Sequence, residues 1–213
     1  MNTVLEAATS YVKEELAGEG SGHDWWHIYR VEQLAITLAT EEGADLFICR
    51  LAALLHDVAD EKLNESEEAG MKKVADWLAL HAVDPEQAQH VLSIIQGMSF
   101  KGGGGQIMPT LEGKIVQDAD RLDALGAVGI ARTFQYSGNR GQLIYDPDLP
   151  VRVTMTKEEY RNGRSTAINH FYEKLLKLKE HMNTDYGKKL AEERHAYMET
   201  FLKTFYAEWD GKK

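Results

Sequence analysis

Leu51-Ala-Ala-Leu-Leu-His-Asp-Val-Ala-Asp60 is the stretch that decides the fold, because a strongly apolar run suddenly carries an imidazole and two carboxylates. The residues from Asp45 onward are apolar nearly all round, which is typical of a helix in the middle of a bundle. Burying groups such as His56 and Asp57 without partners costs several kcal/mol. Something must therefore satisfy these side chains, and a divalent cation would do so.

Helical spacing indicates which of these side chains lie together. His56 and Asp60 are four residues apart and would share a helix face, while Asp57 would lie about 100° round the helix, close enough to reach one ion with His56. Earlier in the chain, His27 precedes Arg30 by three residues, so both would lie on one helix face. A candidate metal ligand would then lie beside a side chain suited to binding phosphate. Two imidazole nitrogens with carboxylate oxygens suit Mn, Fe, Co, Ni or Zn better than Ca.

A third segment, Ile115-Val-Gln-Asp-Ala-Asp-Arg-Leu-Asp-Ala-Leu125, supplies three more carboxylates, at Asp118, Asp120 and Asp123. On a helix, Asp118 and Asp120 point about 200° apart, so both can hardly reach one ion. Spacing alone leaves the choice between these two residues open.

Apolar spacings of three and four residues dominate the chain and predict an all-α fold, a helical bundle with the metal site between core helices. We expect one domain over residues 1–213, since a chain of 213 residues can bury one large core. The predicted parts are a core over about 20–136, a loop or small hairpin over about 137–163, and C-terminal helices over about 164–210 that pack on the core. The expected helices cover about 3–17, 25–42, 45–60, 65–80, 84–98, 110–136, 165–182 and 184–209. Asp24 is expected to cap the second helix, Gly43 to end it and Asp45 to begin the third.

Composition limits the partners and the location of the protein. A net charge of −10 argues against binding to duplex nucleic acid or to a membrane surface. The single cysteine, Cys49, rules out an intrachain disulfide and favours an inert core thiol in a reducing compartment. The start, Met1-Asn-Thr-Val-Leu-Glu6, resembles no secretory signal, and no apolar run reaches membrane-spanning length. We expect a cytoplasmic protein.

The ordered set of these motifs resembles a known signature. His27-x-x-Arg30-Val, Leu-Leu-His56-Asp57-Val-Ala-Asp60 and Ala-Asp120-Arg-Leu-Asp-Ala-Leu125 are similar to the H…HD…D pattern of the HD-domain metal-dependent phosphohydrolases. The resemblance covers about Asp24 to Arg132. Further stretches look like the small bacterial HD-domain nucleotide pyrophosphohydrolases, namely Asp24-Trp-Trp-His27, Ser99-Phe-Lys101-Gly, Gln117-Asp-Ala-Asp-Arg-Leu-Asp-Ala-Leu-Gly-Ala127 and Asn169-His-Phe-Tyr-Glu-Lys174.

The resemblance implies one divalent ion held by His27, His56, Asp57 and Asp120. The family's fourth ligand is usually the aspartate that follows an apolar-Ala pair and precedes x-Leu/Phe-x-Ala, which selects Asp120. Relatives often carry an apolar residue where this chain has Asp118, which is the alternative ligand. The expected ion is Mn²⁺, with Mg, Co, Ni, Fe and Zn as the other candidates.

The resemblance also implies roles for charged residues near the ion. A divalent ion lowers the pKa of its water from about 16 to about 7. Asp60 matches the position where related nucleotidases place an acid near the attacking water, so we expect it to act as general base or to orient that water. Arg30 is expected to act in catalysis by offsetting charge on the phosphates. The other candidates to hold a polyphosphate are Lys62, Lys101 and Arg132.

The expected reaction is hydrolysis of a nucleoside or deoxynucleoside triphosphate to the monophosphate and pyrophosphate. The bond that is cut comes from the resemblance, since spacing supports only metal-assisted phosphate hydrolysis. The alternatives are a 5′-nucleotidase or phosphodiesterase of the same superfamily, a di-iron HD oxygenase, and a nucleotide-binding regulator without catalysis. The expected partner is a small-molecule nucleotide, and a homodimer is left open.

Overall fold

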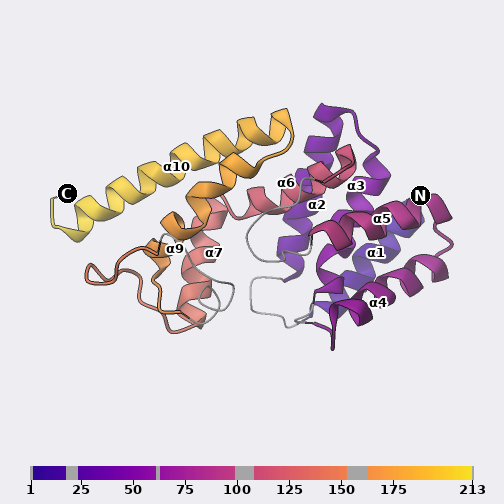
Figure 1. Ribbon diagram of the computed structural model, residues 1–213, viewed down its shortest axis with the longest axis horizontal. Helices are drawn as coiled ribbons and strands as arrows, with labels where there is room; N and C mark the ends of the chain where they lie inside the picture. The colour runs from indigo at the N-terminus through magenta and orange to yellow at the C-terminus, as the bar shows by residue number, and fades with distance from the viewer. Residues whose placement is uncertain (1, 18–23, 61–62, 99–107, 153–162, 213) are drawn as a thin grey trace. The chain divides into compact units, whose positions relative to one another are not determined.

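The structure is a computed structural model that describes residues 2–17, 24–60, 63–98, 108–152 and 163–212 (Figure 1). Lys62 and Lys101 lie outside the described residues. Every regular element within the described ranges is a helix, which confirms the predicted all-α class. The chain divides into two compact units, residues 1–120 and residues 121–213, which we call the N-terminal and the C-terminal unit. The expectation of a single domain stays a prediction.

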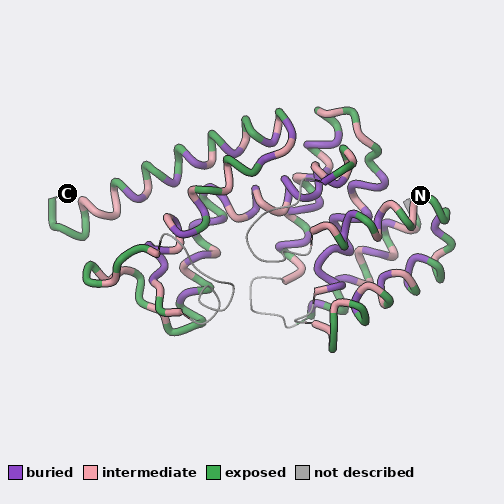
Figure 2. The backbone as a smooth tube through the Cα atoms, viewed as in Figure 1, coloured by how far each residue is buried: buried purple, intermediate pink, exposed green. Residues whose placement is uncertain are grey.

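The N-terminal unit is built around the apolar helix that the sequence predicted. Its elements are α1 (Asn2–Glu15), α2 (Trp25–Glu42), α3 (Leu46–Leu55), the 3-10 helix η1 (His56–Ala59), α4 (Glu67–Leu80), α5 (Pro85–Met98) and α6 (Leu111–Asp123), whose last three residues belong to the C-terminal unit. Helix α3 contacts α1, α2 and α5, and Figure 2 shows that it is buried along nearly its whole length. The end of this central helix carries the His-Asp pair.

Predicted capping residues fix where the helices around the site begin and end. The Asp24 carboxylate accepts a hydrogen bond from the backbone N–H of His27 at 2.9 Å, which places His27 in the first turn of α2. Gly43 closes the same helix in the left-handed conformation, with φ of 73°. Asp45 then caps α3 by accepting from the backbone N–H groups of Phe47 and Ile48. These boundaries confirm the sequence-based prediction.

The chain leaves the α-helical path just at the His-Asp pair. Helix α3 ends at Leu55, His56 begins the 3-10 turn η1, and Asp60 is extended, with φ of −61° and ψ of 136°. The expectation that His56 and Asp60 share one α-helical face is therefore wrong. The physical cause is local, because the Asn64 side chain donates hydrogen bonds to the carbonyls of Val58 at 2.8 Å and Asp60 at 2.9 Å and so satisfies groups that would otherwise continue a helix.

A glycine in α4 lets that helix approach the turn. A Cβ atom built on Gly70 would lie 2.4 Å from the carbonyl oxygen of Ala59, far inside van der Waals contact. Only glycine allows the backbones of α4 and η1 to come this close. The position of the His56–Ala59 turn thus depends on a missing side chain as well as on the hydrogen bonds of Asn64.

The C-terminal unit differs from the prediction at two helix breaks. Its elements are α7 (Gly126–Asn139), α9 (Ala167–Glu173), η2 (Leu175–His181) and α10 (Asp185–Trp209). The single helix predicted over 110–136 is divided into α6 and α7 at Gly126, which has φ of 71°, a conformation that ends a right-handed helix. The helix predicted over 165–182 changes to a 3-10 helix after Lys174. Residues 142–152 form no strand, and the rest of the predicted hairpin lies outside the described residues.

Two sequence-based statements about the apolar helices can be checked. Cys49 is fully buried in α3, and burial, helped by the charges of Glu112 and Asp45, raises the pKa of its thiol to about 12. The thiol is thus inert, as predicted. Within the described residues, no helix combines the length and the apolar character needed to cross a bilayer.

Candidate metal centre

Three segments far apart in the sequence bring four predicted ligands together in the N-terminal unit. His27 comes from the first turn of α2, His56 and Asp57 from η1, and Asp120 from the end of α6. His27 Nε2 lies 3.5 Å from Asp57 Oδ2 and 3.4 Å from Asp120 Oδ1, while His56 Nε2 lies 3.3 Å from Asp57 Oδ1. One donor atom from each of His27, His56 and Asp57 falls within 4.8 Å of the others, so this trio could hold a metal ion.

The cluster is closed on one side and open on the other. The side chains of His27, His56 and Asp57 are only 2%, 5% and 9% exposed, whereas that of Asp120 is 42% exposed. Three of the donors are therefore buried, and Asp120 is the member of the cluster that is open to solvent.

The hydrogen bond of His56 orients its ring for metal binding. His56 Nδ1 lies 2.8 Å from the carbonyl oxygen of Ala53, so Nδ1 carries the proton and donates it. The lone pair is then on Nε2, which is buried and makes no hydrogen bond to any of the described residues. A buried imidazole nitrogen costs free energy in this state, and a cation would remove that cost.

The donor set and its spacing fit a transition-metal ion. Two atoms that each lie about 2.1 Å from a shared ion are about 3.0 to 3.4 Å apart, depending on the coordination angle. The observed separations of 3.3 to 3.5 Å are close to this range. Imidazole nitrogens with carboxylate oxygens suit Mn, Fe, Co, Ni or Zn.

The charge state of Asp120 also suits a ligand. Burial acts to raise the pKa of this carboxyl group, but the hydrogen bond with His27 and, whenever these imidazoles are protonated, the charges of His56 and His27 outweigh it, so the pKa lies below its ordinary value. Asp120 is thus held as a carboxylate, the form that coordinates cations. Its neighbour Asp118 is completely buried two residues earlier on α6. The 3.4 Å contact between Asp120 and His27 favours Asp120 as the fourth ligand.

The other predicted site residues lie in different surroundings. Arg30 is half-buried on α2, one turn after His27, and Asp60 is half-buried directly after η1. Arg132, on α7 of the C-terminal unit, forms an ion pair with the buried carboxylate of Asp123. That pair gives Arg132 a structural role beside the predicted one.

Three residues near the cluster escaped the sequence-based prediction. Asn64 and Gly70 shape the turn that holds His56, and neither belongs to a metal-binding pattern. Trp26, which precedes His27, belongs to no metal-binding pattern either, and it is 60% exposed. An adjacent pair of tryptophans at a helix start could have raised this possibility, because one helix turn cannot bury both rings on one face.

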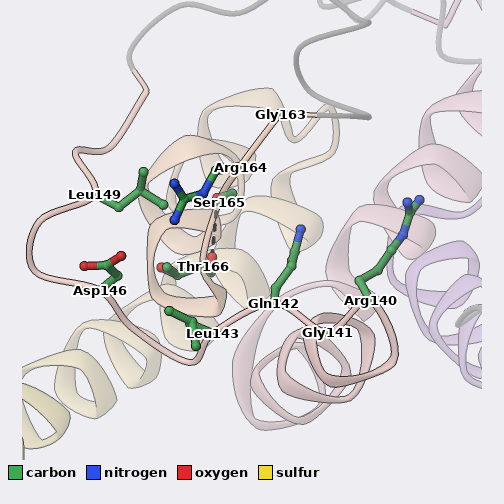
Figure 3. A pocket seen from close by; sticks show the side chains of 10 residues that line it. All are labelled: Arg140, Gly141, Gln142, Leu143, Asp146, Leu149, Gly163, Arg164, Ser165 and Thr166. Carbon is green, nitrogen blue, oxygen red and sulfur yellow. Dashed lines mark hydrogen bonds between the residues drawn. The ribbon is translucent and has the colours of Figure 1, made fainter.

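A separate hollow of about 400 Å³ lies within the C-terminal unit, between the end of α7 and the start of α9 (Figure 3). Figure 3 shows the side chains of Arg140, Gln142 and Arg164 along it, with Asp146 beyond them. None of the predicted site residues that the structure describes lines this hollow. The candidate metal ligands lie instead in the His-Asp cluster of the N-terminal unit.

Comparison with known proteins agrees with this geometry. Residues 25–125, which contain all four clustered ligands, match the model of the HD domain. The protein YpgQ of Bacillus subtilis (strain 168) is 42% identical over 200 residues, which cover 93% of this chain and 90% of YpgQ. This chain belongs to the HD-domain family.

Solved structures extend the similarity of this HD-domain protein over nearly the full chain. An HD-superfamily hydrolase from Bacillus thuringiensis is 52% identical to this chain. The match covers 97% of this chain and 96% of the hydrolase chain, with a TM-score of 0.79. A second match is the crystal structure of Bacillus subtilis YpgQ in complex with ADP, whose sequence is 39% identical to this chain. The match covers 94% of this chain and 95% of the YpgQ chain, with a TM-score of 0.76.

Proposed function

We propose that this HD-domain protein is a metal-dependent phosphohydrolase that converts nucleoside or deoxynucleoside triphosphates to the monophosphate and pyrophosphate. One observation carries the proposal. The buried Nε2 of His56 makes no hydrogen bond to the described residues, although Ala53 fixes the ring and Asp57 lies beside it. The relatives support the reaction class, because one is described as an HD-superfamily hydrolase and another was crystallised with ADP.

His27, His56, Asp57 and Asp120 would hold the divalent ion, and their donor set fits Mn²⁺. When bound, such an ion acts as a Lewis acid on a phosphate oxygen and makes water acidic enough to react near neutral pH. The closed side of the cluster keeps bulk water away and strengthens the electrostatic interactions of these residues. The exposed side, at Asp120, is where a triphosphate would enter.

Asp60 and Arg30 act on the reacting groups in this proposal. Asp60 accepts the proton of the attacking water, and the hydrogen bond from Asn64 to its carbonyl holds its backbone for that task. Arg30 binds phosphate oxygens and offsets the charge that grows on them as the phosphoanhydride bond breaks. Lys62, Lys101 and Arg132 are proposed as further phosphate-binding groups.

The decisive experiment incubates metal-reconstituted protein with nucleotides and separates the products. Monophosphate with pyrophosphate supports the proposal. Phosphate released from a monophosphate would indicate a 5′-nucleotidase, and nucleotide binding without turnover would indicate a regulator. Dependence of turnover on two irons and O₂ would indicate an oxygenase.

Asp60→Asn tests the proposed base. We expect turnover to fall at least about 100-fold while the bound metal stays at the wild-type level, because the change removes a proton acceptor and keeps the shape of the side chain. The matched control is Asp76→Asn, the same change at an exposed position on α4. Equal turnover in Asp60→Asn and wild type would remove Asp60 from the mechanism.

A further inference from the structure

An exposed aromatic pair adjoins the metal cluster on helix α2. Trp26 is 60% exposed and Tyr29 is 42% exposed, and their rings meet edge to face with centroids 5.9 Å apart at 82°. Tyr29 also contacts Trp25, at 6.3 Å between centroids, and the Lys13 ammonium lies 4.7 Å from the centre of the Trp25 ring. Tyr29 thus connects the exposed Trp26 ring to Trp25, and Trp25 in turn contacts Lys13 of α1.

The position of Trp26 relates it to the cluster. Trp26 directly precedes the ligand His27 and lies four residues before Arg30, so Trp26 and Arg30 share one flank of α2. Viewed along the helix axis, Arg30 lies between His27 and Trp26. Arg30 is half-buried, and Trp26 is exposed. A ligand with its phosphates at the metal and Arg30 would extend its other end toward the indole.

Exposure of the indole also needs an explanation. A tryptophan side chain can bury 150–250 Å² of surface, yet Trp26 keeps more than half of its surface in solvent. A flat aromatic surface beside a cationic side chain is suited to stacking a nucleobase, and such stacking tolerates different bases because every base has a π-face.

We propose that Trp26, supported by Tyr29, stacks the base of the nucleotide whose phosphates occupy the metal cluster. This inference rests on the proposed function and makes it more specific, because it assigns the nucleoside end of the ligand to α2. Since stacking is insensitive to the identity of the base, it predicts a broad choice of bases at this contact.

The test compares a ligand that has a base with one that lacks it. Dissociation constants of ADP and of pyrophosphate are measured by calorimetry on the Mn²⁺-loaded full-length protein. We expect Trp26→Ala to weaken ADP about 10- to 100-fold and to leave pyrophosphate within about twofold. Trp26→Phe should restore most of the ADP affinity, because it keeps a ring. Trp209→Ala is the matched control, since it removes a tryptophan that is 50% exposed on α10, and should change neither ligand.

Each outcome decides the inference. Unchanged ADP affinity in Trp26→Ala, equal losses for ADP and pyrophosphate, or no ADP binding by the wild type would overturn it. Nucleotide turnover is measured separately from ADP binding, so a failure of the stacking proposal can be told apart from a failure of the proposed hydrolysis. A protein that binds ADP through Trp26 but hydrolyses no nucleotide would keep this inference and refute the proposed reaction.

Discussion

The two units each contain a buried polar cluster, and the clusters differ in how their charges are satisfied. In the C-terminal unit, the Glu173 carboxylate is 1% exposed, and the Arg152 guanidinium binds it through two hydrogen bonds of 2.8 and 2.7 Å. The hydroxyl of Ser165 donates a third, at 2.9 Å. In the N-terminal unit, the buried Nε2 of His56 makes no hydrogen bond to the described residues.

This difference distinguishes a structural cluster from the cluster that we propose as a ligand site. The hydrogen bonds of Glu173 outweigh burial, which alone would raise its pKa, and hold the pKa below its ordinary value. The cluster of Glu173 is thus complete in the protein itself. We propose that the His-Asp cluster is instead completed by a bound ion, and the following changes test that contrast.

The largest effect is expected for His56→Ala. Loss of this ligand should abolish metal retention and lower turnover at least about 1000-fold, equal to about 4 kcal/mol. Added Mn²⁺ should raise the melting temperature of the wild type, because an ion that binds only the folded state stabilises it, but should leave that of the variant unchanged. Metal content and thermal shifts measure both. Unchanged activity in His56→Ala would refute the proposed centre.

Glu173→Ala should have the next largest effect, on stability. The change leaves the partly buried guanidinium of Arg152 without its carboxylate and should lower the free energy of unfolding by about 3 kcal/mol. Urea denaturation measures the loss. The Mn²⁺-dependent thermal shift should persist in this variant. If the shift disappeared, the two clusters would not be independent.

Gly70→Ala tests how the His56–Ala59 turn is positioned. The new Cβ would overlap the Ala59 carbonyl, so we expect a loss of about 2 kcal/mol in stability together with weaker Mn²⁺ binding. Gly138→Ala on α7 is the matched control, because a Cβ there meets nothing within 4 Å and should stabilise by about 0.5 kcal/mol. Similar behaviour of the two variants would contradict the role of Gly70.

The smallest expected effect is on stability at acidic pH and involves His170. Burial, followed by the charge of Lys174, lowers the pKa of His170 to about 4 from its usual 6.5. Between these values the unfolded chain binds more protons than the folded protein, so stability falls as the pH decreases from 6.5 toward 4. Allowing for the partial exposure of the ring, His170 should account for about 1 kcal/mol of the loss between pH 6.5 and 5. Denaturation of His170→Asn at both pH values should show a correspondingly smaller loss.

Sequence patterns predicted the features that depend on local chemistry. The caps at Asp24 and Asp45, the stop at Gly43 and the burial of α3 follow from side-chain types and spacing, and the structure confirms them. The convergence of His27, His56, Asp57 and Asp120 was expected from three separate motifs, and the structure places these side chains together. Their roles as ligands stay a prediction.

Features that depend on particular side-chain contacts or on one backbone angle could not be predicted in the same way. The 3-10 turn at His56 results from the side chain of Asn64 and from the approach of Gly70 to Ala59. The helix break at Gly126 requires a positive φ. The apolar residues keep a helical spacing across this glycine, so the sequence pattern does not indicate the break. Likewise, spacing could not show that Asp123 would pair with Arg132. Each outcome depends on a neighbour whose position the local pattern does not specify.

The exposure of Asp120 has a consequence for identifying the native ion. Because the Asp120 side chain is 42% exposed, an ion held in the proposed centre would exchange without unfolding of the protein. Divalent ions compete for such nitrogen and oxygen donors mainly by availability. A sample that has passed over a nickel column or been stored with zinc should therefore carry that metal, so cells grown in defined metal supplies, with purification free of both, would reveal the physiological occupant.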